Sequence, residues 1–327
     1  MDAAREATKP APHNKYRELV AMARELAPVT TAIVHPCDQT SLAGALEAAR
    51  SGLITPILVG PAVRVRNIAR EAALDIGGLE LVGSLHSHDS AARAVGLVRA
   101  GQVEALMKGS LHTDELMAAV VAREGGLRTE RRISHCFVMD VPGHEVPLII
   151  TDAAVNIAPD LEAKADIVRN AIDLAGALRF SEIRVAILSA IETVNPRVPS
   201  TIEAAALCKM ADRGQIAGAL LDGPLALDNA INAEAAAVKR IVSPVAGKAN
   251  VLVVPDLEAG NMLAKSLSFL AGADAAGIVL GARVPIILTS RADSLLTRVA
   301  SAAVAVLLVH ARRIRTAEAM HRGAPDE

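Results

Sequence analysis

The chain has 327 residues, a formal net charge of -2 and very few aromatic residues, with one tyrosine, three phenylalanines and no tryptophan. So small a net charge provides no field to attract nucleic acid or an anionic membrane, and so few rings give no platform on which bases could stack. The three cysteines, Cys37, Cys136 and Cys208, are far apart and form no C-x-x-C pair, which argues against a disulfide framework or a zinc ribbon and fits a reducing cytoplasm.

The first part of the chain alternates between strand-like and helical segments. Residues 1–14 are polar, contain prolines and follow no pattern, so we expect a flexible leader there. After the leader, short apolar runs alternate with amphipathic segments as far as residue 122, which is typical of a doubly wound, mostly parallel α/β sheet. The predicted helices are 15–26, 41–51, 63–73, 90–100 and 114–122, and the predicted strands are 30–34, 56–59, 79–82 and 105–107.

The middle of the chain departs from this alternation. Two strand-like runs, 132–141 and 146–151, are joined only by Pro142-Gly143-His144-Glu145, and so short a connection permits antiparallel pairing. The length of the chain fits two ordinary domains, and we place the change between them here. Beyond this point the predicted helices are 161–178, 200–213, 229–239, 261–270 and 294–315, and the predicted strands are 185–188, 218–221, 250–254, 276–280 and a run beginning at Val284.

The sequence contains no segment that resembles a signal or a membrane anchor. The N-terminus lacks an apolar signal core. The longest lipid-like run, 302–309, is far shorter than the roughly 20 residues that cross a bilayer as a helix. We therefore expect a soluble, cytoplasmic protein with no membrane partner and no nucleic-acid partner.

The segment V-P-I-I-L-T-S-R-A-D-S, residues 284–294, joins a buried strand to a cluster of polar groups. In open α/β sheets, ligands bind beyond the carboxyl ends of the strands. There, Ser290 could donate to a developing oxyanion, Arg291 could grip a phosphate group and Asp293 could accept a proton. The alternative is a solvated turn in which Ser290 or Asp293 caps the helix that begins near Ser294.

A second polar segment, M-K-G-S-L-H-T at residues 107–113, has the same placement between a strand and a helix. Gly109 would let the backbone approach a ligand, and Lys108, Ser110, His112 and Thr113 would supply a cation and hydroxyl groups to an anion at the helix N-terminus. The segment is neither a Walker loop nor a G-x-G-x-x-G motif, and a simple turn is the alternative.

Two further loops carry polar residues after strands. Asp152 and Asn156 in T-D-A-A-V-N could hydrogen-bond a substrate or could form a structural turn. Asp256 and Glu258 in P-D-L-E-A-G-N could contact a divalent metal, but no third spaced ligand accompanies them and such loops usually cap helices. We therefore expect no metal site.

Taken together, these segments give the chain a resemblance to the phosphate acetyltransferase and phosphate butyryltransferase family, over nearly all of its length after the leader. The similarity is greatest to the transferase portion of proteins described as bifunctional enoyl-CoA hydratase and phosphate acetyltransferase. It rests on M-K-G-S-L-H-T at Met107, T-D-A-A-V-N at Thr151, D-G-P-L-A-L-D-N-A-I at Asp222, S-P-V-A-G-K-A-N at Ser243, P-D-L-E-A-G-N at Pro255 and T-S-R-A-D-S at Thr289.

The resemblance implies a two-domain α/β fold like that of isocitrate and isopropylmalate dehydrogenases, with the site in the interdomain cleft and a homodimer as the assembly. The implied domains are 15–150 plus 285–327, because the last helix returns to the first domain, and 151–284. The implied reaction is acyl-CoA plus inorganic phosphate giving acyl phosphate plus CoA, without a metal or redox cofactor. A separate enoyl-CoA hydratase is a possible partner.

The same resemblance assigns roles to individual residues. Ser290 matches the family serine that stabilises the tetrahedral intermediate, and Arg291 matches the arginine that binds the phosphoryl group. With Asp293 these form the predicted catalytic set. The predicted substrate-binding residues are Lys108, Gly109, Ser110, His112, Thr113, Asp152, Asn156, Asp256 and Asn261.

Two positions depart from the acetyl-type pattern. Thr297 stands where acetyl-type members carry the aspartate that is the proposed base for the CoA thiol, and Met117 stands where they carry an arginine. Butyryl-type members share S-R-x-D-S and M-K-G with this chain. We therefore hypothesise that Asp293 takes over the role of base and that Lys108 supplies the missing positive charge.

The leading interpretation is a phosphate acyltransferase with acetyl as the favoured group and butyryl or another short chain as the alternative. The fold analogy suggests a decarboxylating dehydrogenase as a rival, but that enzyme needs metal-binding aspartates and a nicotinamide pocket that the sequence does not show. A catalytically silent regulator that binds CoA or acyl phosphate is a third possibility, favoured by the two departures.

Overall fold

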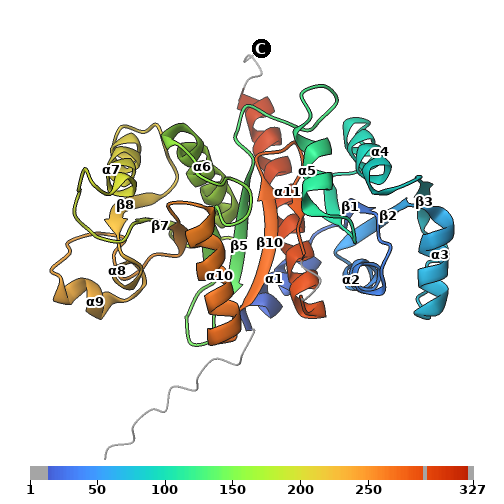
Figure 1. The fold of residues 1–327 in the computed structure, drawn as a ribbon, viewed down its shortest axis with the longest axis horizontal. Helices are drawn as coiled ribbons and strands as arrows, with labels where there is room; N and C mark the ends of the chain where they lie inside the picture. The colour runs from blue at the N-terminus through green and yellow to red at the C-terminus, as the bar shows by residue number, and fades with distance from the viewer. Residues whose placement is uncertain (1–13, 290–292, 323–327) are drawn as a thin grey trace, which may run out of the picture.

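The computed structural model describes residues 14–289 and 293–322, and these form an α/β protein built on one large sheet (Figure 1). The helices are α1 (Asn14–Arg24), α2 (Gln39–Arg50), α3 (Ala62–Glu71), α4 (Ser87–Arg99), α5 (Thr113–Val121), α6 (Leu161–Ala177), α7 (Pro199–Asp212), α8 (Leu227–Ile231), α9 (Ala233–Val238), α10 (Leu257–Ala271) and α11 (Leu295–Arg322). The strands are β1 (Val29–Val34), β2 (Ile54–Gly60), β3 (Glu80–Gly83), β4 (Ala105–Lys108), β5 (Ser134–Asp140), β6 (Leu148–Thr151), β7 (Arg184–Leu188), β8 (Leu220–Leu225), β9 (Val251–Val253), β10 (Asp274–Leu280) and β11 (Ile286–Ile287). The alternating pattern of the sequence is thus confirmed almost element for element.

The sheet has 11 strands in the order β3-β2-β1-β4-β11-β10-β5-β6-β9-β7-β8. Pairing is parallel on both sides, from β3 to β11 and from β6 to β8. It is antiparallel only in the centre, between β11 and β10, β10 and β5, and β5 and β6. The short connection between β5 and β6 permits the last of these pairings, as the sequence predicts. The predicted fold class, a mostly parallel α/β sheet, is confirmed.

The strands from the two halves of the chain interleave in the sheet. β10, from the segment predicted to belong to the second domain, pairs with β5 along its whole length and with β11. The centre of the sheet is therefore shared by the predicted domains. Their proposed boundaries remain a prediction.

Two elements differ from the sequence prediction. The helix expected over 229–239 is divided into α8 and α9, because Asn232 ends the first and its side chain accepts the backbone N–H groups of Glu234 and Ala235 at the start of the second. The strand expected from Val284 forms ladder pairs only at Ile286 and Ile287.

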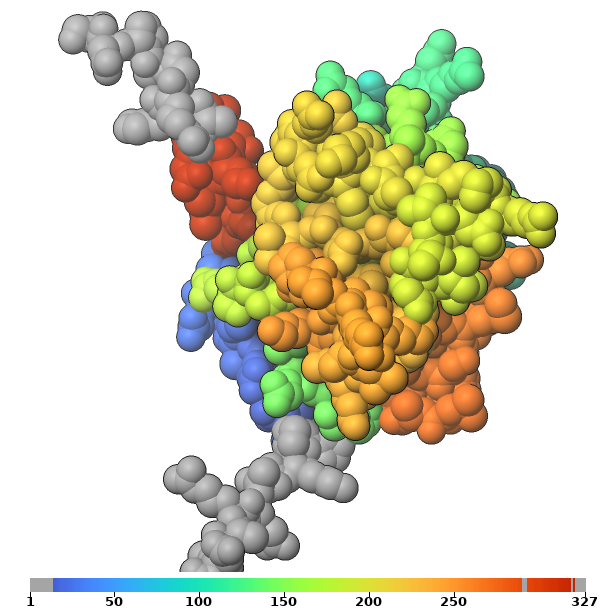
Figure 2. Space-filling model, turned by 90° about the vertical axis from the view of Figure 1, so that its left-hand side faces the viewer, coloured from blue at the N-terminus to red at the C-terminus, as the bar shows by residue number. Residues whose placement is uncertain are grey.

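Helices cover both faces of the sheet (Figure 1). On one face, α1, α2, α6 and α11 pack against the central strands and enclose the largest apolar cluster. On the other face, α4 and α5 cover the half near β1, while α8, α9 and α10 cover the half near β9. Figure 2 looks onto the end of the molecule carried by the second half, where the yellow and orange segments that include α7 to α10 form most of the surface.

The last helix is more apolar than the sequence analysis recognised. Within it, the segment Leu295–Glu318 has the length and composition of a helix that could cross a membrane. The expectation that the longest apolar run is too short to span a bilayer is therefore wrong for the helix as a whole. Of the most apolar 18-residue stretch of this segment, however, 72% is buried inside the protein, where it forms part of the main core.

The first helix is tied to the sheet by buried polar contacts. The Lys15 ammonium donates to Asp140 Oδ1 at 2.7 Å and to the Val141 carbonyl at 3.0 Å. The Tyr16 hydroxyl donates to the Val138 carbonyl at 2.7 Å and accepts the N–H of Ala276. These contacts lock α1 onto β5 and β10.

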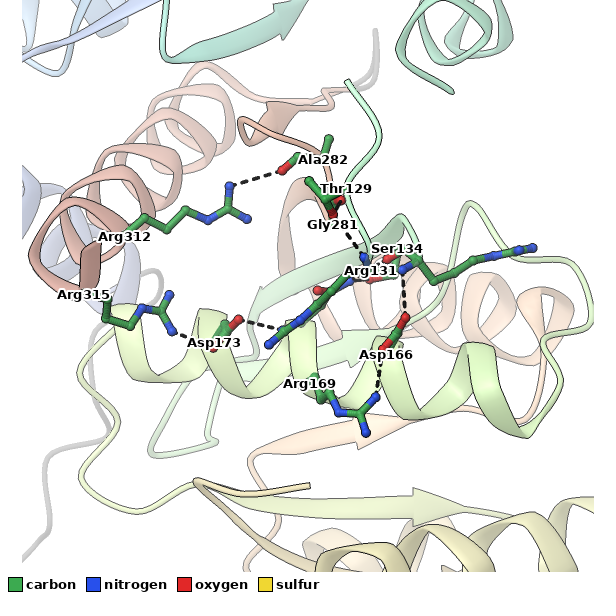
Figure 3. Close-up of polar contacts among 12 residues, drawn as sticks. Thr129, Arg131, Ser134, Asp166, Arg169, Asp173, Gly281, Ala282, Arg312 and Arg315 are labelled. Atoms are coloured by element: carbon green, nitrogen blue, oxygen red, sulfur yellow. Dashed lines mark hydrogen bonds and ion pairs between the residues drawn. The ribbon is translucent and has the colours of Figure 1, made fainter. Parts of the chain in front are cut away.

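Ion pairs fix the end of the last helix (Figure 3). Asp173 on α6 accepts from Arg131, at 2.8 Å, and from Arg315 on α11, at 2.6 Å. Arg312, one turn earlier, points its guanidinium at the Ala282 carbonyl. The helix is thereby joined both to α6 and to the segment between β10 and β11.

Candidate active site

A cavity of about 730 Å³ opens beside the central strands of the sheet. Three of the predicted site residues lie in its wall, Lys108 at the end of β4, Thr113 at the start of α5, and Asp293 before α11. The remaining lining residues come from β5, the loop after β6, α10, β10 and the residue before it, and the segment from β11 into the first turn of α11. They are His135, Phe137, Ala154, Ala264, Lys265, Ser268, Phe269, Ala273, Asp274, Ala275, Leu288, Thr289, Ser294 and Thr297.

Two of the predicted catalytic residues, Ser290 and Arg291, lie outside the described residues. The described residues on either side of that gap, Thr289 and Asp293, both line the cavity. The structure therefore places both ends of the predicted T-S-R-A-D-S segment at one site, and the roles of Ser290 and Arg291 remain predictions.

Asp293 shares the cavity region with a buried arginine that the sequence analysis missed. Arg298 lies in the first turn of α11, is only 5% exposed and donates to Thr289 Oγ1 at 3.0 Å. Burial lowers the pKa of Arg298, and the negative charge of Asp293 opposes that shift. A cation is unfavourable at a helix N-terminus. That local mismatch was the sequence signal that could have identified Arg298.

Thr297, the first departure from the acetyl-type pattern, is engaged with the protein. Its hydroxyl lies 3.0 Å from Asp274 Oδ1, and Ser294 caps its backbone N–H at 3.1 Å. A threonine hydroxyl has no basic group for proton abstraction at neutral pH. Among the described residues that line the cavity, the carboxylates that could accept a proton are those of Asp293 and Asp274.

The second departure, Met117, packs partly buried against the apolar cluster under α4 and α5. It brings no charge to the site. Lys108, proposed to compensate for it, does line the cavity, and its ammonium lies 3.4 Å from the Gly109 carbonyl.

Gly109 is needed for contact between strands. A β-carbon added there would lie 2.5 Å from the carbonyl oxygens of Val34 and His35, closer than any real side chain allows. The Gly109 N–H donates to the Val34 carbonyl at 2.8 Å. The close approach predicted for this glycine is thus made to the backbone beyond β1.

Ser110 and His112 face a second cavity, of about 530 Å³, on the other side of the same loop. The Ser110 hydroxyl donates to the His35 carbonyl at 2.9 Å, and the His112 N–H donates to Glu115 Oε2 at 2.9 Å. The predicted anion-binding loop is therefore divided between two cavities, with Lys108 and Thr113 in the larger one.

Asp152 and Asn156 form a closed structural turn. The Asp152 carboxylate accepts the backbone N–H groups of Ala154 and Val155 at 3.0 Å and that of Asn156 at 3.1 Å. The Asn156 amide donates to the Ile133 carbonyl at 2.9 Å. Neither side chain is among the described residues that line the large cavity.

Asp256 and Asn261 belong to α10. Asp256 caps the helix by accepting the Ala259 N–H at 2.8 Å, and the Asn261 amide points at the Ala153 carbonyl at 3.3 Å. Both lie outside the described lining of the large cavity, and a role in substrate binding for them remains a prediction.

His135 is a further cavity residue that sequence reasoning missed. It is the third residue of the apolar run I-S-H-C-F-V, only 2% exposed, and burial lowers its pKa to about 4. A neutral imidazole therefore faces the site. No spacing in the sequence links His135 to the other polar segments.

Comparisons with known proteins agree with this fold and show its family. The family model described as "Phosphate acetyl/butaryl transferase" matches residues 84–306. A phosphate acetyltransferase of Rhizobium meliloti is 66% identical over 304 residues, which cover 93% of this chain and 96% of that protein. A phosphate butyryltransferase of Clostridium acetobutylicum is 38% identical over 285 residues, 87% of this chain and 94% of that protein.

Among solved structures, a branched-chain phosphotransacylase from Enterococcus faecalis superimposes with a TM-score of 0.75 at 31% identity, covering 86% of this chain and 99% of that one. The fold and the site thus define an acyltransferase of the class that joins acyl groups to phosphate. The chain belongs to the phosphate acetyl/butyryl transferase family. The family predicted from the six sequence motifs is confirmed.

Proposed function

We infer that the protein is a phosphate acetyltransferase, which interconverts acetyl-CoA and inorganic phosphate with acetyl phosphate and CoA. The observation that carries this inference is the 66% identity to a phosphate acetyltransferase over almost the full length of both chains. The cavity supports it, because a cation, hydroxyl groups and a carboxylate meet there beside an apolar wall.

The reaction requires three functions at one place. Phosphate must be held against the thioester, the tetrahedral oxyanion must be stabilised, and in the reverse direction the CoA thiol, with an ordinary pKa of about 8.5, must lose its proton. We assign Lys108 and Thr113 to the phosphate, and Asp293 to the proton of the thiol. Ser290 and Arg291 take the oxyanion and phosphoryl roles that the family resemblance implies.

The proposed mechanism uses no metal or redox cofactor. Within residues 14–289 and 293–322, no group of three or more histidine, cysteine, aspartate or glutamate side chains is arranged to hold a metal ion. The family resemblance also supports a homodimer, a cytoplasmic location and a possible separate enoyl-CoA hydratase as partner, and these remain proposals.

The length of the preferred acyl group has two candidates, acetyl and butyryl. The apolar wall of the cavity combines Phe137 and Leu288 with the small side chains Ala264, Ala273 and Ala275. Such small residues leave room for chains longer than acetyl, so butyryl is the second candidate. We expect kcat/KM, measured as phosphate-dependent CoA release, to be highest for acetyl-CoA; a maximum at butyryl-CoA would assign the alternative.

Replacing Lys108 with methionine is expected to raise the KM for phosphate by about tenfold or more, because a hydrogen bond to a charged group contributes about 1.5–3 kcal/mol. Initial rates at varied phosphate would measure this. Lys209→Met serves as the control, since Lys209 is an exposed lysine paired with Asp212 on α7. An unchanged KM in the Lys108 variant would remove this lysine from the phosphate site.

A further inference from the structure

The imidazole nitrogens of His135 have no hydrogen-bond partner among the described residues. Its Nδ1 is buried without a hydrogen-bond partner, and Nε2 has no hydrogen bond to any residue in 14–289 or 293–322. Leaving buried polar atoms unpaired costs free energy, so nearly all such atoms in folded proteins are satisfied. Nδ1 is enclosed by the protein, whereas Nε2 is not among the enclosed unpaired atoms, so Nε2 is the nitrogen that a group entering the cavity can reach.

The surroundings hold the ring in one orientation. Phe137, two residues along β5, packs against it edge to face, with ring centroids 4.4 Å apart and an interplanar angle of 76°. On the neighbouring strand, a β-carbon at Gly277 would lie 2.5 Å from the Leu288 carbonyl oxygen and 3.0 Å from His135 Nε2. The glycine thus leaves room for the imidazole, and Phe137 packs against the ring.

The charge of the ring is also set by its surroundings. Burial lowers the pKa of His135 to about 4, although the negative charge of Asp152 opposes the shift. Asp152 cannot orient the ring, because its oxygens accept hydrogen bonds from its own loop and from Asn156. At neutral pH the ring is a neutral imidazole with one N–H donor, and a base of such low pKa would be poorly matched to a thiol.

We propose that His135 donates a hydrogen bond to the acyl carbonyl oxygen and to the oxyanion formed from it, an inference that rests on the proposed acetyltransferase function. A phosphate oxygen attacks the thioester carbon, a C–O bond forms, and the carbonyl π electrons move onto the oxygen that faces His135. The intermediate then collapses, the C–S bond breaks, and the departing CoA thiolate takes up the proton that phosphate has lost. His135 keeps its own proton throughout.

The carbonyl oxygen is a better partner for this ring than phosphate. A neutral donor stabilises charge that develops in the transition state without binding the phosphate dianion more tightly in the ground state. The apolar neighbours Phe137, Ala275 and Leu288 line the same cavity and suit the hydrocarbon part of an acyl group. Lys108 supplies the positive charge that a phosphate dianion needs.

Three variants test the proposal. His135→Phe keeps the ring but removes both nitrogens, and His135→Gln retains an N–H donor near the position of Nε2. His144→Phe is the matched control, because His144 also has a buried nitrogen without a partner, at Nε2, but lies in the turn between β5 and β6 away from the cavity. Each would be assayed for kcat, for the KM of phosphate and of acetyl-CoA, and for thermal stability.

We expect His135→Phe to lower kcat by about 100-fold, with both KM values within about threefold of wild type and a melting temperature that does not fall. His135→Gln should recover part of the lost rate, and His144→Phe should retain wild-type kinetics. An unchanged kcat, or a raised KM for phosphate at unchanged kcat, would overturn the proposal. So would a loss of rate that follows a loss of stability.

The pH dependence separates a donor from a base. If His135 is a neutral donor, kcat of the wild type should not fall with decreasing pH near pH 6.5. A fall there that is absent from His135→Phe would contradict the assigned role. If the wild type releases no CoA, the proposed acetyltransferase function is wrong, whatever the role of His135. The contact would still be tested by the rise in melting temperature that acetyl-CoA produces in the wild type, which His135→Phe should diminish.

Discussion

Replacing Asp293 with asparagine is expected to lower the turnover number by about two orders of magnitude or more, with the fold retained. Asp293 lines the large cavity, and its charge acts on the buried Arg298 beside Thr289. At the position where acetyl-type relatives place their proposed base, this chain has Thr297, which is hydrogen-bonded to Asp274. Asparagine is nearly isosteric with aspartate but accepts no proton, so the substitution removes the proposed base, and with it the negative charge that acts on Arg298.

The measurement is the rate of acetyl-CoA formation from acetyl phosphate and CoA as a function of pH. Without a base, the residual rate should increase with pH toward the ordinary thiol pKa of about 8.5, because the thiolate then forms unaided. Asp212→Asn, at an exposed carboxylate on α7, is the control and should behave as wild type. Unchanged turnover in the Asp293 variant would remove this residue from the mechanism.

Replacing Asp140 with alanine is expected to lower the free energy of unfolding by about 3–5 kcal/mol, the range found when one partner of a buried ion pair is removed. Asp140 is 1% exposed, and Lys15 is only 8% exposed. In the variant, the Lys15 ammonium would lose its carboxylate and keep, among the described residues, the Val141 carbonyl at 3.0 Å. It would also leave the N–H of Tyr16 without the carboxylate that accepts it at 3.2 Å.

Urea denaturation of the variant would measure this loss. The control is Asp212→Ala, which breaks an ion pair whose side chains are 66% and 62% exposed and should leave the denaturation midpoint nearly unchanged. A loss below about 1 kcal/mol for Asp140→Ala would show that Lys15 reaches solvent when its partner is removed, and that α1 is held mainly by apolar packing.

The fold was largely predictable because its elements are encoded locally. Apolar periodicity and turn residues located almost every helix and strand, and the short β5–β6 connection indicated the antiparallel centre. The exceptions have local causes that periodicity does not report. Asn232 divides a continuous helical pattern by capping a new start, and β11 is limited to the two residues that find ladder partners.

The site was less predictable, because its contacts join distant segments. Hydroxyls and charges after strands identified Lys108, Thr113 and Asp293, which the fold does bring to one cavity. Periodicity could not show that the Asp152 carboxylate accepts three backbone N–H groups of its own loop, and its role in substrate binding remains a prediction. His135 was not predicted because a histidine within an apolar run is typical of a buried core position. The cavity beside it is formed by β10 and α10, which are distant in the sequence.

The most direct test of the central claim is to measure CoA and acetyl phosphate together when the purified protein is mixed with acetyl-CoA in metal-chelated buffer, with and without inorganic phosphate. The proposed function predicts that CoA and acetyl phosphate are formed in equal amounts, and only when phosphate is present. CoA release that is independent of phosphate and yields acetate would contradict it. No release from folded protein that binds CoA would also contradict it, and would favour a silent CoA-binding regulator.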